Sequence, residues 1–249
     1  MAVTSFFFKH IADPKKQMEN IHLDAYLTVL YTSSEMAGLR SFKRRVTITS
    51  TSFMATIFRM WMKYNREEDT PESSTQNELQ IANEDLFEMS QFIIGEEPSW
   101  GHVKPWHDYD KVIAIANILN HWITLCINLK ETCVIVYGSQ QHVWNKQDYE
   151  ISKQNKVLLA RLLPHVLEYA GFFDARKYVT KSLNQWKIDH PEEVNIYELT
   201  DDVNCGPFAL KFAEVILTGK WEHGFDTKSL KKYMHDMAMN VYGFSTNFD

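Results

Sequence analysis

The sequence predicts an α+β fold, and three observations support this prediction. Apolar residues recur at spacings of three and four in the first third of the chain, as at Leu23, Tyr26, Leu27 and Leu30, which is typical of amphipathic helices. Farther along, two apolar runs flank a short polar turn and indicate a β-hairpin. Near the end, Cys205 directly precedes another helical pattern.

Helices account for most of the first third. A second helix is predicted from apolar residues at the same spacing, namely Phe53, Ile57, Met60 and Trp61. Between the two helices, the basic run 40–45 could act as a nuclear import signal, contact an acidic partner or form a solvated loop. Residues 65–80 are polar and acidic without periodicity, so we expect a mobile loop within the domain.

The middle of the chain predicts a buried hairpin followed by a long helix. The strands of the hairpin are His121–Leu129 and Cys133–Tyr137, joined by a Lys-Glu-Thr turn. Helical spacing then runs over residues 148–170, with Pro164 marking a break or kink and Gly171 acting as the C-terminal cap.

The last quarter combines short strands with two helices. Residues 186–188 and 194–199 alternate, or nearly alternate, in the manner of strands. The sequence Asn-Cys-Gly-Pro at 204–207 opens a helix that ends at Gly219. A final helix is expected from Asp226, as its N-cap, to Gly243.

Composition and charge restrict the class of protein. Of the 249 residues, 45% are hydrophobic, which excludes a disordered chain. A chain of this length buries on the order of 70% of its unfolded surface, so we expect one domain spanning 1–249. The formal charge of −6 argues against nucleic acid as the main ligand. No apolar run reaches the ~20 residues of a membrane span.

The three cysteines fall into two kinds. Cys126 and Cys133 lie within apolar strands, where we expect reduced core residues, with a cross-strand disulfide as the alternative. Cys205 begins a helix, where backbone amides and the helix dipole stabilise a thiolate and lower its pKa. It is therefore the candidate nucleophile. Its alternative role is that of a core residue at a helix start.

A thiolate nucleophile needs an imidazole that pairs with it and protonates the leaving group. His121 opens a buried strand beside Trp122, at what would be a sheet edge facing a cleft. A strand-edge histidine without a chemical role is the alternative. A metal centre is disfavoured, because the histidines and cysteines lack the spacing of zinc ligands.

Two segments resemble the catalytic domain of the ubiquitin-like-protein-specific (SUMO/sentrin) cysteine proteases. They are the stretch 121–139, beginning His-Trp, and the stretch 204–214, beginning Asn-Cys-Gly-Pro-Phe, and they occur in the family's order. Segments 21–27 and 105–112 are similar to the family's opening helix and to the stretch before its histidine. The helical segment that ends at 167 is similar to that of the divergent plant and transposon-associated branch.

The resemblance implies a papain-like arrangement, with a central mixed sheet and the nucleophile at the N-terminus of a core helix. It implies that Cys205 is the nucleophile, that its backbone amide forms part of the oxyanion hole, and that His121 is the general base and acid. Trp122 would roof a narrow tunnel that admits a Gly-Gly tail. No cofactor or metal is implied, and the partner would be a SUMO-type modifier or its conjugates.

Three positions depart from the family pattern. The triad aspartate is replaced by Gly138, the oxyanion-hole glutamine by Leu199, and the second tunnel tryptophan aligns with Gln17. In serine proteases, loss of the orienting carboxylate costs ~10^4 in turnover, and loss of one oxyanion donor costs ~10^2 to 10^3. Neutral side chains could orient the imidazole instead, the candidates being Asn128, Ser139, Gln140 and Gln141.

Two functions follow from this pattern. One is a cysteine peptidase that hydrolyses the bond after the Gly-Gly of a ubiquitin-like modifier through a Cys-His dyad. The other is a pseudo-protease that keeps the fold and binds the modifier without cleaving it. An α+β protein unrelated to either activity would leave the shared order of the motifs unexplained. We expect a monomer in the nucleus or cytoplasm, where thiols stay reduced.

Overall fold

A computed structural model of the chain describes residues 5–36, 45–64, 81–97, 104–138, 159–191, 203–220, 225 and 227–246. Helical residues 159–169 precede α6, and the remaining elements are α1 (Ser5–Ile11), α2 (Asn20–Met36), β1 (Val46–Ile48), α3 (Thr51–Tyr64), α4 (Asn83–Ile94), η1 (Trp106–Asp108), β2 (Lys111–Ile118), β3 (His121–Asn128), β4 (Cys133–Tyr137), α6 (Phe172–Ala175), β5 (Lys187–Asp189), α7 (Cys205–Thr218) and α8 (Thr227–Thr246).

The described strands form one mixed five-stranded sheet in the order β1-β2-β3-β4-β5. The three central strands pair antiparallel, and each edge strand pairs parallel with its neighbour. The predicted hairpin is confirmed as β3 and β4, whose turn is fixed by Asn128, because its Oδ1 accepts from the Glu131 backbone N–H at 3.1 Å. A second hairpin joins β2 to β3 through Leu119 and Asn120, both with positive φ, as two-residue hairpin turns require.

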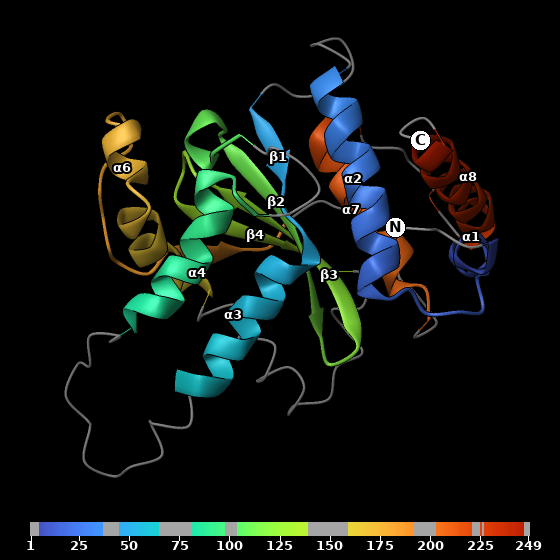
Figure 1. Ribbon diagram of the computed structural model, residues 1–249, viewed down its shortest axis with the longest axis horizontal. Helices are drawn as coiled ribbons and strands as arrows, with labels where there is room; N and C mark the ends of the chain where they lie inside the picture. Colours follow the sequence, from blue (N-terminus) through green and yellow to red (C-terminus); the bar gives the residue numbers. More distant parts are fainter. Residues whose placement is uncertain are drawn as a thin grey trace.

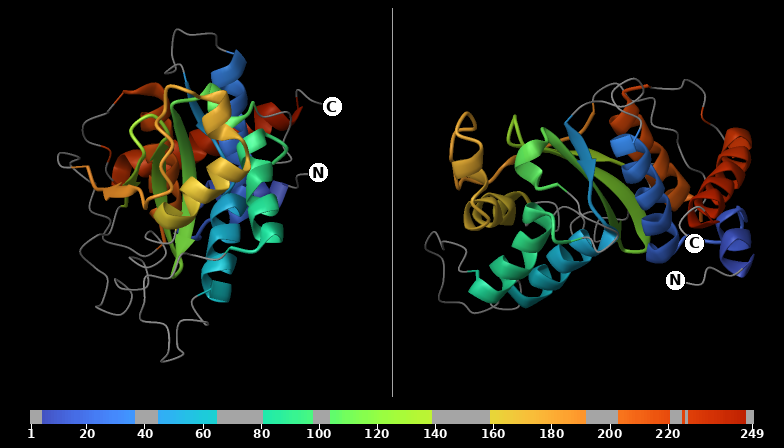
Figure 2. Two further views of the ribbon diagram at one scale, coloured as in Figure 1. Left: turned by 90° about the vertical axis from the view of Figure 1, so that its left-hand side faces the viewer. Right: turned by 45° about the horizontal axis from the view of Figure 1, so that its top comes forward.

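Helices cover both faces of this sheet, and Figures 1 and 2 show α2 and α7 on one side and α3 and α4 on the other. On the α7 side, alternate β3 residues Trp122 and Cys126 join a core with α1, α2 and α8. On the opposite side, Ile123 and Leu125 join a core with α3, α4 and residues 159–173. All eight residues of β3 are buried, as a central strand covered on both faces must be.

Most elements predicted from periodicity are confirmed: α2, α3, β5, α7 with Gly219 as its cap, and α8. Gly171 adopts the left-handed conformation just after helical residues 159–169. The helix continues through Pro164, so a break there is wrong, and the alternative of a kink stays a prediction. The parts of the predictions that concern 40–44, 65–80, 148–158, 194–199 and Asp226 lie outside the described residues. Within those described, no helix combines the length and apolar character needed to cross a membrane.

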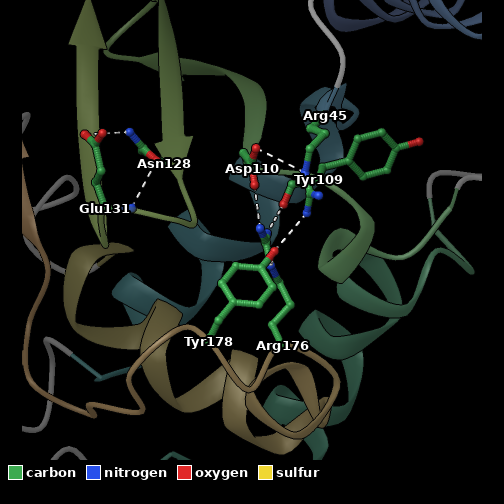
Figure 3. Close-up of polar contacts among 7 residues, drawn as sticks. All are labelled: Arg45, Tyr109, Asp110, Asn128, Glu131, Arg176 and Tyr178. Carbon is green, nitrogen blue, oxygen red and sulfur yellow. Dashed lines mark hydrogen bonds and ion pairs between the residues drawn. The ribbon is translucent and has the colours of Figure 1, made fainter.

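A buried arginine ties the start of β2 to the segment after α6 (Figure 3). The Arg176 side chain is 1% exposed. Its guanidinium donates to the Tyr109 carbonyl, to the Asp110 carboxylate and, through Nε at 2.6 Å, to the Tyr178 hydroxyl. Arg45 binds the other oxygen of Asp110 at 3.1 Å. Because Lys111 of β2 also donates to the Arg45 carbonyl, this cluster fixes β1 against β2.

We predict that Arg176→Met lowers the free energy of unfolding by about 3–5 kcal/mol, because Asp110 then keeps a partly buried charge without its main partner. Lys187→Ala is the matched control: Lys187 pairs with Asp189 on an exposed surface, so its loss should change stability by about 1 kcal/mol or less. Urea unfolding followed by circular dichroism measures both. Equal effects of the two variants would contradict a structural role for the cluster.

Candidate active site

Cys205 is the first residue of α7, and the described surroundings cover it completely, with 0% of its surface exposed. The next residue, Gly206, explains how neighbouring segments come so close. A Cβ atom at Gly206 would lie 3.0 Å from the Met18 Cβ and 3.4 Å from the Trp122 ring. A glycine is therefore needed after the cysteine, because only a residue without a side chain lets the 17–18 segment and Trp122 pack on the helix start.

Next to this cysteine, two hydrogen bonds join the segment before α2 to the start of β3 and the residue that precedes it. The Trp122 Nε1 donates to the Met18 carbonyl at 3.0 Å. The Gln17 Nε2 donates to the Asn120 carbonyl at 2.7 Å. Trp122 is 2% exposed and packs in the same core cluster as Cys205. The structure thus brings the predicted nucleophile and the predicted tunnel tryptophan together.

Burial raises the pKa of the Cys205 thiol above its ordinary value of 9.0. Hydrogen bonds from the backbone N–H groups of Trp122, Gly206 and Cys205 itself, and from the Gln17 side chain, oppose this rise without cancelling it. The predicted lowering of this pKa is therefore wrong, because desolvation of the thiolate outweighs the amides at the helix start. In keeping with a protonated thiol, the Sγ donates to the Asn120 carbonyl at 4.0 Å.

His121 lies between Asn120 and Trp122, whose backbone atoms contact the thiol. It is 6% exposed, and its partner across the β2–β3 pair is Ile118. Residues directly opposed in an antiparallel pair project to the same face, so His121 projects to the face of Ile118 and Trp122 to the other. Cys205 packs in the core cluster on the Trp122 face, so the strand register alone does not bring the His121 imidazole to the sulfur.

The position that the resemblance assigns to the triad aspartate is residue 138, which the structure describes and which is a glycine. A Cβ atom built on Gly138 would lie 3.3 Å from the Ile123 Cγ2 methyl, on the same face of the sheet as His121. This position therefore faces the histidine side but carries no carboxylate. Leu199, the predicted degenerate oxyanion position, lies outside the described residues, as do Ser139, Gln140 and Gln141.

Asn128 cannot orient His121, so that alternative is wrong. The two residues are the last and the first of β3. The Asn128 side chain instead bonds Glu131 through both of its amide atoms, with Nδ2 donating to the carboxylate at 3.0 Å (Figure 3). Its role is to hold the β3–β4 turn.

The other two cysteines are reduced and buried, as predicted, and the alternative of a cross-strand disulfide is wrong. The register places Cys126 opposite Ile135 and Cys133 opposite Asn128, so the two thiols are not direct partners across the hairpin. Burial raises the pKa of Cys133, which further reduces its reactivity.

Among the described residues, one group of side chains has the composition of a metal site. It consists of His10, Glu19 and His22, whose ligand atoms lie within 4.8 Å of one another. The His22 Nδ1, however, accepts a hydrogen bond from the Glu19 backbone N–H at 3.1 Å. A neutral His22 therefore carries its proton on Nε2, and the imidazoles of His10 and His22 stack with their centroids 4.2 Å apart. We interpret the group as a packing contact.

Gln17 is the site residue that sequence reasoning missed. The resemblance gives it only the place of a missing tryptophan, and no local pattern connects it with Cys205. A polar residue where the resemblance implies an indole was the available signal. Its side chain contacts both the thiol and the carbonyl of Asn120, the residue before His121.

Comparison with known proteins assigns a family to this arrangement. The sequence model of the "Ulp1 protease family, C-terminal catalytic domain" matches residues 16–246. A search of curated proteins found no match. A structure of the SUMO protease Ulp1 with its catalytic cysteine oxidised to a sulfonic acid aligns with a TM-score of 0.56 at 12% identity, covering 98% of this chain and 85% of that one.

A second structure, the C-terminal Ulp1 protease domain in complex with Smt3, the yeast ortholog of SUMO, aligns with a TM-score of 0.50 at 13% identity. It covers 96% of this chain and 82% of that one. At such identities the likeness shows the fold alone. The expected papain-like α+β fold is thereby confirmed, whereas the plant and transposon-associated branch stays a prediction.

We predict that alkylation of Cys205 by iodoacetamide accelerates with pH and is still accelerating at pH 9.0, because burial holds the thiol pKa above that value and only the thiolate reacts. Mass spectrometry of the Cys205 peptide over a pH series measures the rate, with Cys126 and Cys133 counted separately. A rate that is already constant at neutral pH would show a lowered pKa and contradict this description.

Proposed function

This chain belongs to the Ulp1 protease family, and from that membership we propose that it hydrolyses the bond after the C-terminal Gly-Gly of a SUMO-type modifier, with Cys205 as nucleophile and His121 as general base and acid. The observation that carries the proposal is the position of the thiol. It lies at the start of a buried helix, bonded to the Trp122 N–H and close to the Asn120 carbonyl, the two groups that flank His121.

The chemistry proceeds in two balanced steps. His121 takes the Cys205 proton as the sulfur attacks the glycine carbonyl carbon, and the carbonyl electron pair moves onto oxygen. The tetrahedral species collapses, the C–N bond breaks, and the imidazolium gives its proton to the departing amine. Water then attacks the thioester with His121 as base. The products are the modifier carboxylate, released with a proton, and the free thiol.

Two features of the site set the speed of this reaction. The backbone N–H groups of Cys205 and Gly206 face the sulfur at the start of α7 and so are placed to stabilise negative charge there. Against this, burial keeps the resting thiol protonated, and Gly138 supplies no carboxylate to balance the imidazolium. We therefore propose a slow peptidase that works with a Cys-His dyad.

The packing around the thiol supports a narrow substrate tail. A Cβ atom on Gly206 would lie 3.0 Å from the Met18 Cβ and 3.4 Å from the Trp122 ring, and we propose that a chain that reaches the sulfur beside these residues is equally narrow. A Gly-Gly tail meets that requirement. The three free cysteines fit a reducing compartment, and we propose a monomer that acts in the nucleus or cytoplasm without a cofactor.

A second candidate function is that of a modifier-binding domain without turnover. Gly138 at the triad position favours it, as does the raised pKa of a thiol that the structure covers completely. Both candidates require the modifier to bind, and they differ in whether Cys205 reacts.

We predict that a SUMO-type modifier ending in a reactive electrophile forms a covalent adduct with Cys205 and that Cys205→Ala and His121→Ala each abolish it. Electrophoresis with mass spectrometry detects the adduct, and an active protease of the same family serves as the positive control. Binding of the modifier without an adduct, in conditions where the control reacts, would support the second candidate and contradict the first.

We predict that Gly138→Asp raises turnover by at least about tenfold, because an orienting carboxylate is worth up to ~10^4 in serine proteases. The substitution fits if the Ile123 methyl shifts by a few tenths of an ångström, since the new Cβ would lie 3.3 Å from it. Cleavage of a modifier fusion measures turnover. Gly138→Asn, which is nearly equal in volume but neutral, is the matched control, and equal gains from both variants would exclude a charge effect.

A further inference from the structure

We propose that the side-chain amide of Gln17 is the oxyanion donor of this site, a role that rests on the proposed peptidase function. Gln17 lies in the segment between α1 and α2, far from Cys205 in the sequence. Its side chain is exposed, whereas Cys205 is fully buried. Gln17 therefore lies on the side from which a substrate carbonyl reaches the sulfur.

The two hydrogen bonds of the Gln17 amide define its orientation. Nε2 carries two N–H groups. One donates to the Asn120 carbonyl at 2.7 Å, and the side chain is also a hydrogen-bond partner of the Cys205 thiol. Since a carbonyl only accepts, the nitrogen rather than the oxygen of this amide must face Asn120. The hydrogen bond from Gln17 lowers the pKa of the Cys205 thiol, as a donor to the sulfur does, so the amide also donates at the reacting centre.

The backbone around Gln17 is fixed on both sides, which makes the donor preorganised. The His10 Nε2 donates to the Gln17 carbonyl at 2.9 Å. The next carbonyl, that of Met18, accepts from the Trp122 Nε1 at 3.0 Å, and Met18 is 2% exposed. A donor held in this way loses little freedom when charge develops, which is what makes oxyanion donors effective.

When the thiolate attacks, the negative charge moves from the sulfur to the carbonyl oxygen, which is bonded to the carbon that the sulfur attacks. The electron pair of the carbonyl bond ends on the oxygen, beside the sulfur. The groups that already surround the sulfur are the Cys205 and Gly206 N–H groups and the Gln17 amide. As the carbonyl arrives, it displaces the Gln17 N–H from the sulfur onto its own oxygen, while the bond to Asn120 keeps the amide in place.

The hydrogen-bonding properties of an amide suit position 17 better than those of a carboxylate or an indole. A carboxylate would repel the developing charge, and an indole ring would present its single N–H in only one direction. The Gln17 amide donates one N–H to the Asn120 carbonyl and has the other available for the substrate oxygen. Gln17 thus supplies a neutral donor next to the thiol in a chain whose residue 199 is leucine.

Three variants test this role. Gln17→Glu keeps the shape but removes both N–H groups, Gln17→Ala removes the side chain, and Lys15→Ala changes an exposed neighbour as the control. Both Gln17 variants should lower kcat for modifier cleavage by roughly 10^2- to 10^3-fold, the cost of one oxyanion donor, with little change in KM, and Lys15→Ala should match the wild type. Alkylation of Cys205 by iodoacetamide passes through no oxyanion. In Gln17→Ala alkylation should therefore fall much less than kcat, because the variant loses a hydrogen bond to the thiolate but also uncovers the sulfur.

The outcomes separate this inference from the proposed function. Wild-type cleavage that persists unchanged in Gln17→Ala overturns the inference alone. Faster cleavage in that variant would show that Gln17 only covers the thiol, and a parallel fall in cleavage and alkylation would show that it acts on the thiolate. Either result overturns the oxyanion role. A wild-type chain without cleavage activity contradicts the proposed function and this inference together.

Discussion

The site depends on one buried hydrogen bond between the helix that begins at Cys205 and the strand that begins at His121. The Thr124 hydroxyl donates to the Ala209 carbonyl at 2.7 Å, and Thr124 is 0% exposed. Such a group could not find a solvent partner if the helix slid along the strand, so the bond fixes their register. Cys205 lies one helical turn before Ala209, and Trp122 lies two residues before Thr124. Fixing one pair therefore places the thiol beside the Trp122 amide.

Placing the Cys205 thiol in the core raises its pKa, and the hydrogen-bond donors around it offset this rise only in part. A helix packed between a central strand and α2 leaves its first residue without water, and desolvation raises the pKa of the thiol. The donors that oppose the rise are neutral, namely three backbone N–H groups and one amide. They stabilise charge on the sulfur or next to it without holding a permanent charge in the core.

Much of the fold could be predicted because its central elements have strong local patterns. β3 and β4 are continuous apolar runs, and α7 has a defined start and a glycine cap at Gly219. β1 has only three residues, and its strand character comes from pairing with β2, so no local pattern reveals it. The position of Cys205 at a helix start, where the dipole lowers a thiol pKa, can be predicted from sequence. The burial that raises this pKa instead depends on Met18 and Trp122, which lie far from Cys205 in the chain. The hydrogen bond between Gln17 and Asn120 also joins residues far apart in the chain, so no local pattern predicts it.

The lack of a carboxylate at Gly138 is electrostatically consistent with the buried, protonated thiol of Cys205. A carboxylate at 138 would favour a charged imidazole, and a charged imidazole is most useful beside a thiolate. Here the thiol is held protonated and donates to the Asn120 carbonyl, so the resting site contains no thiolate that needs a counter-charge. In the proposed reaction, negative charge appears only during attack, when the carbonyl of the substrate replaces the groups that cover the sulfur. In the reaction proposed above, neutral donors such as Gln17 would stabilise the transition state, because the carboxylate that could do so by charge is replaced by Gly138.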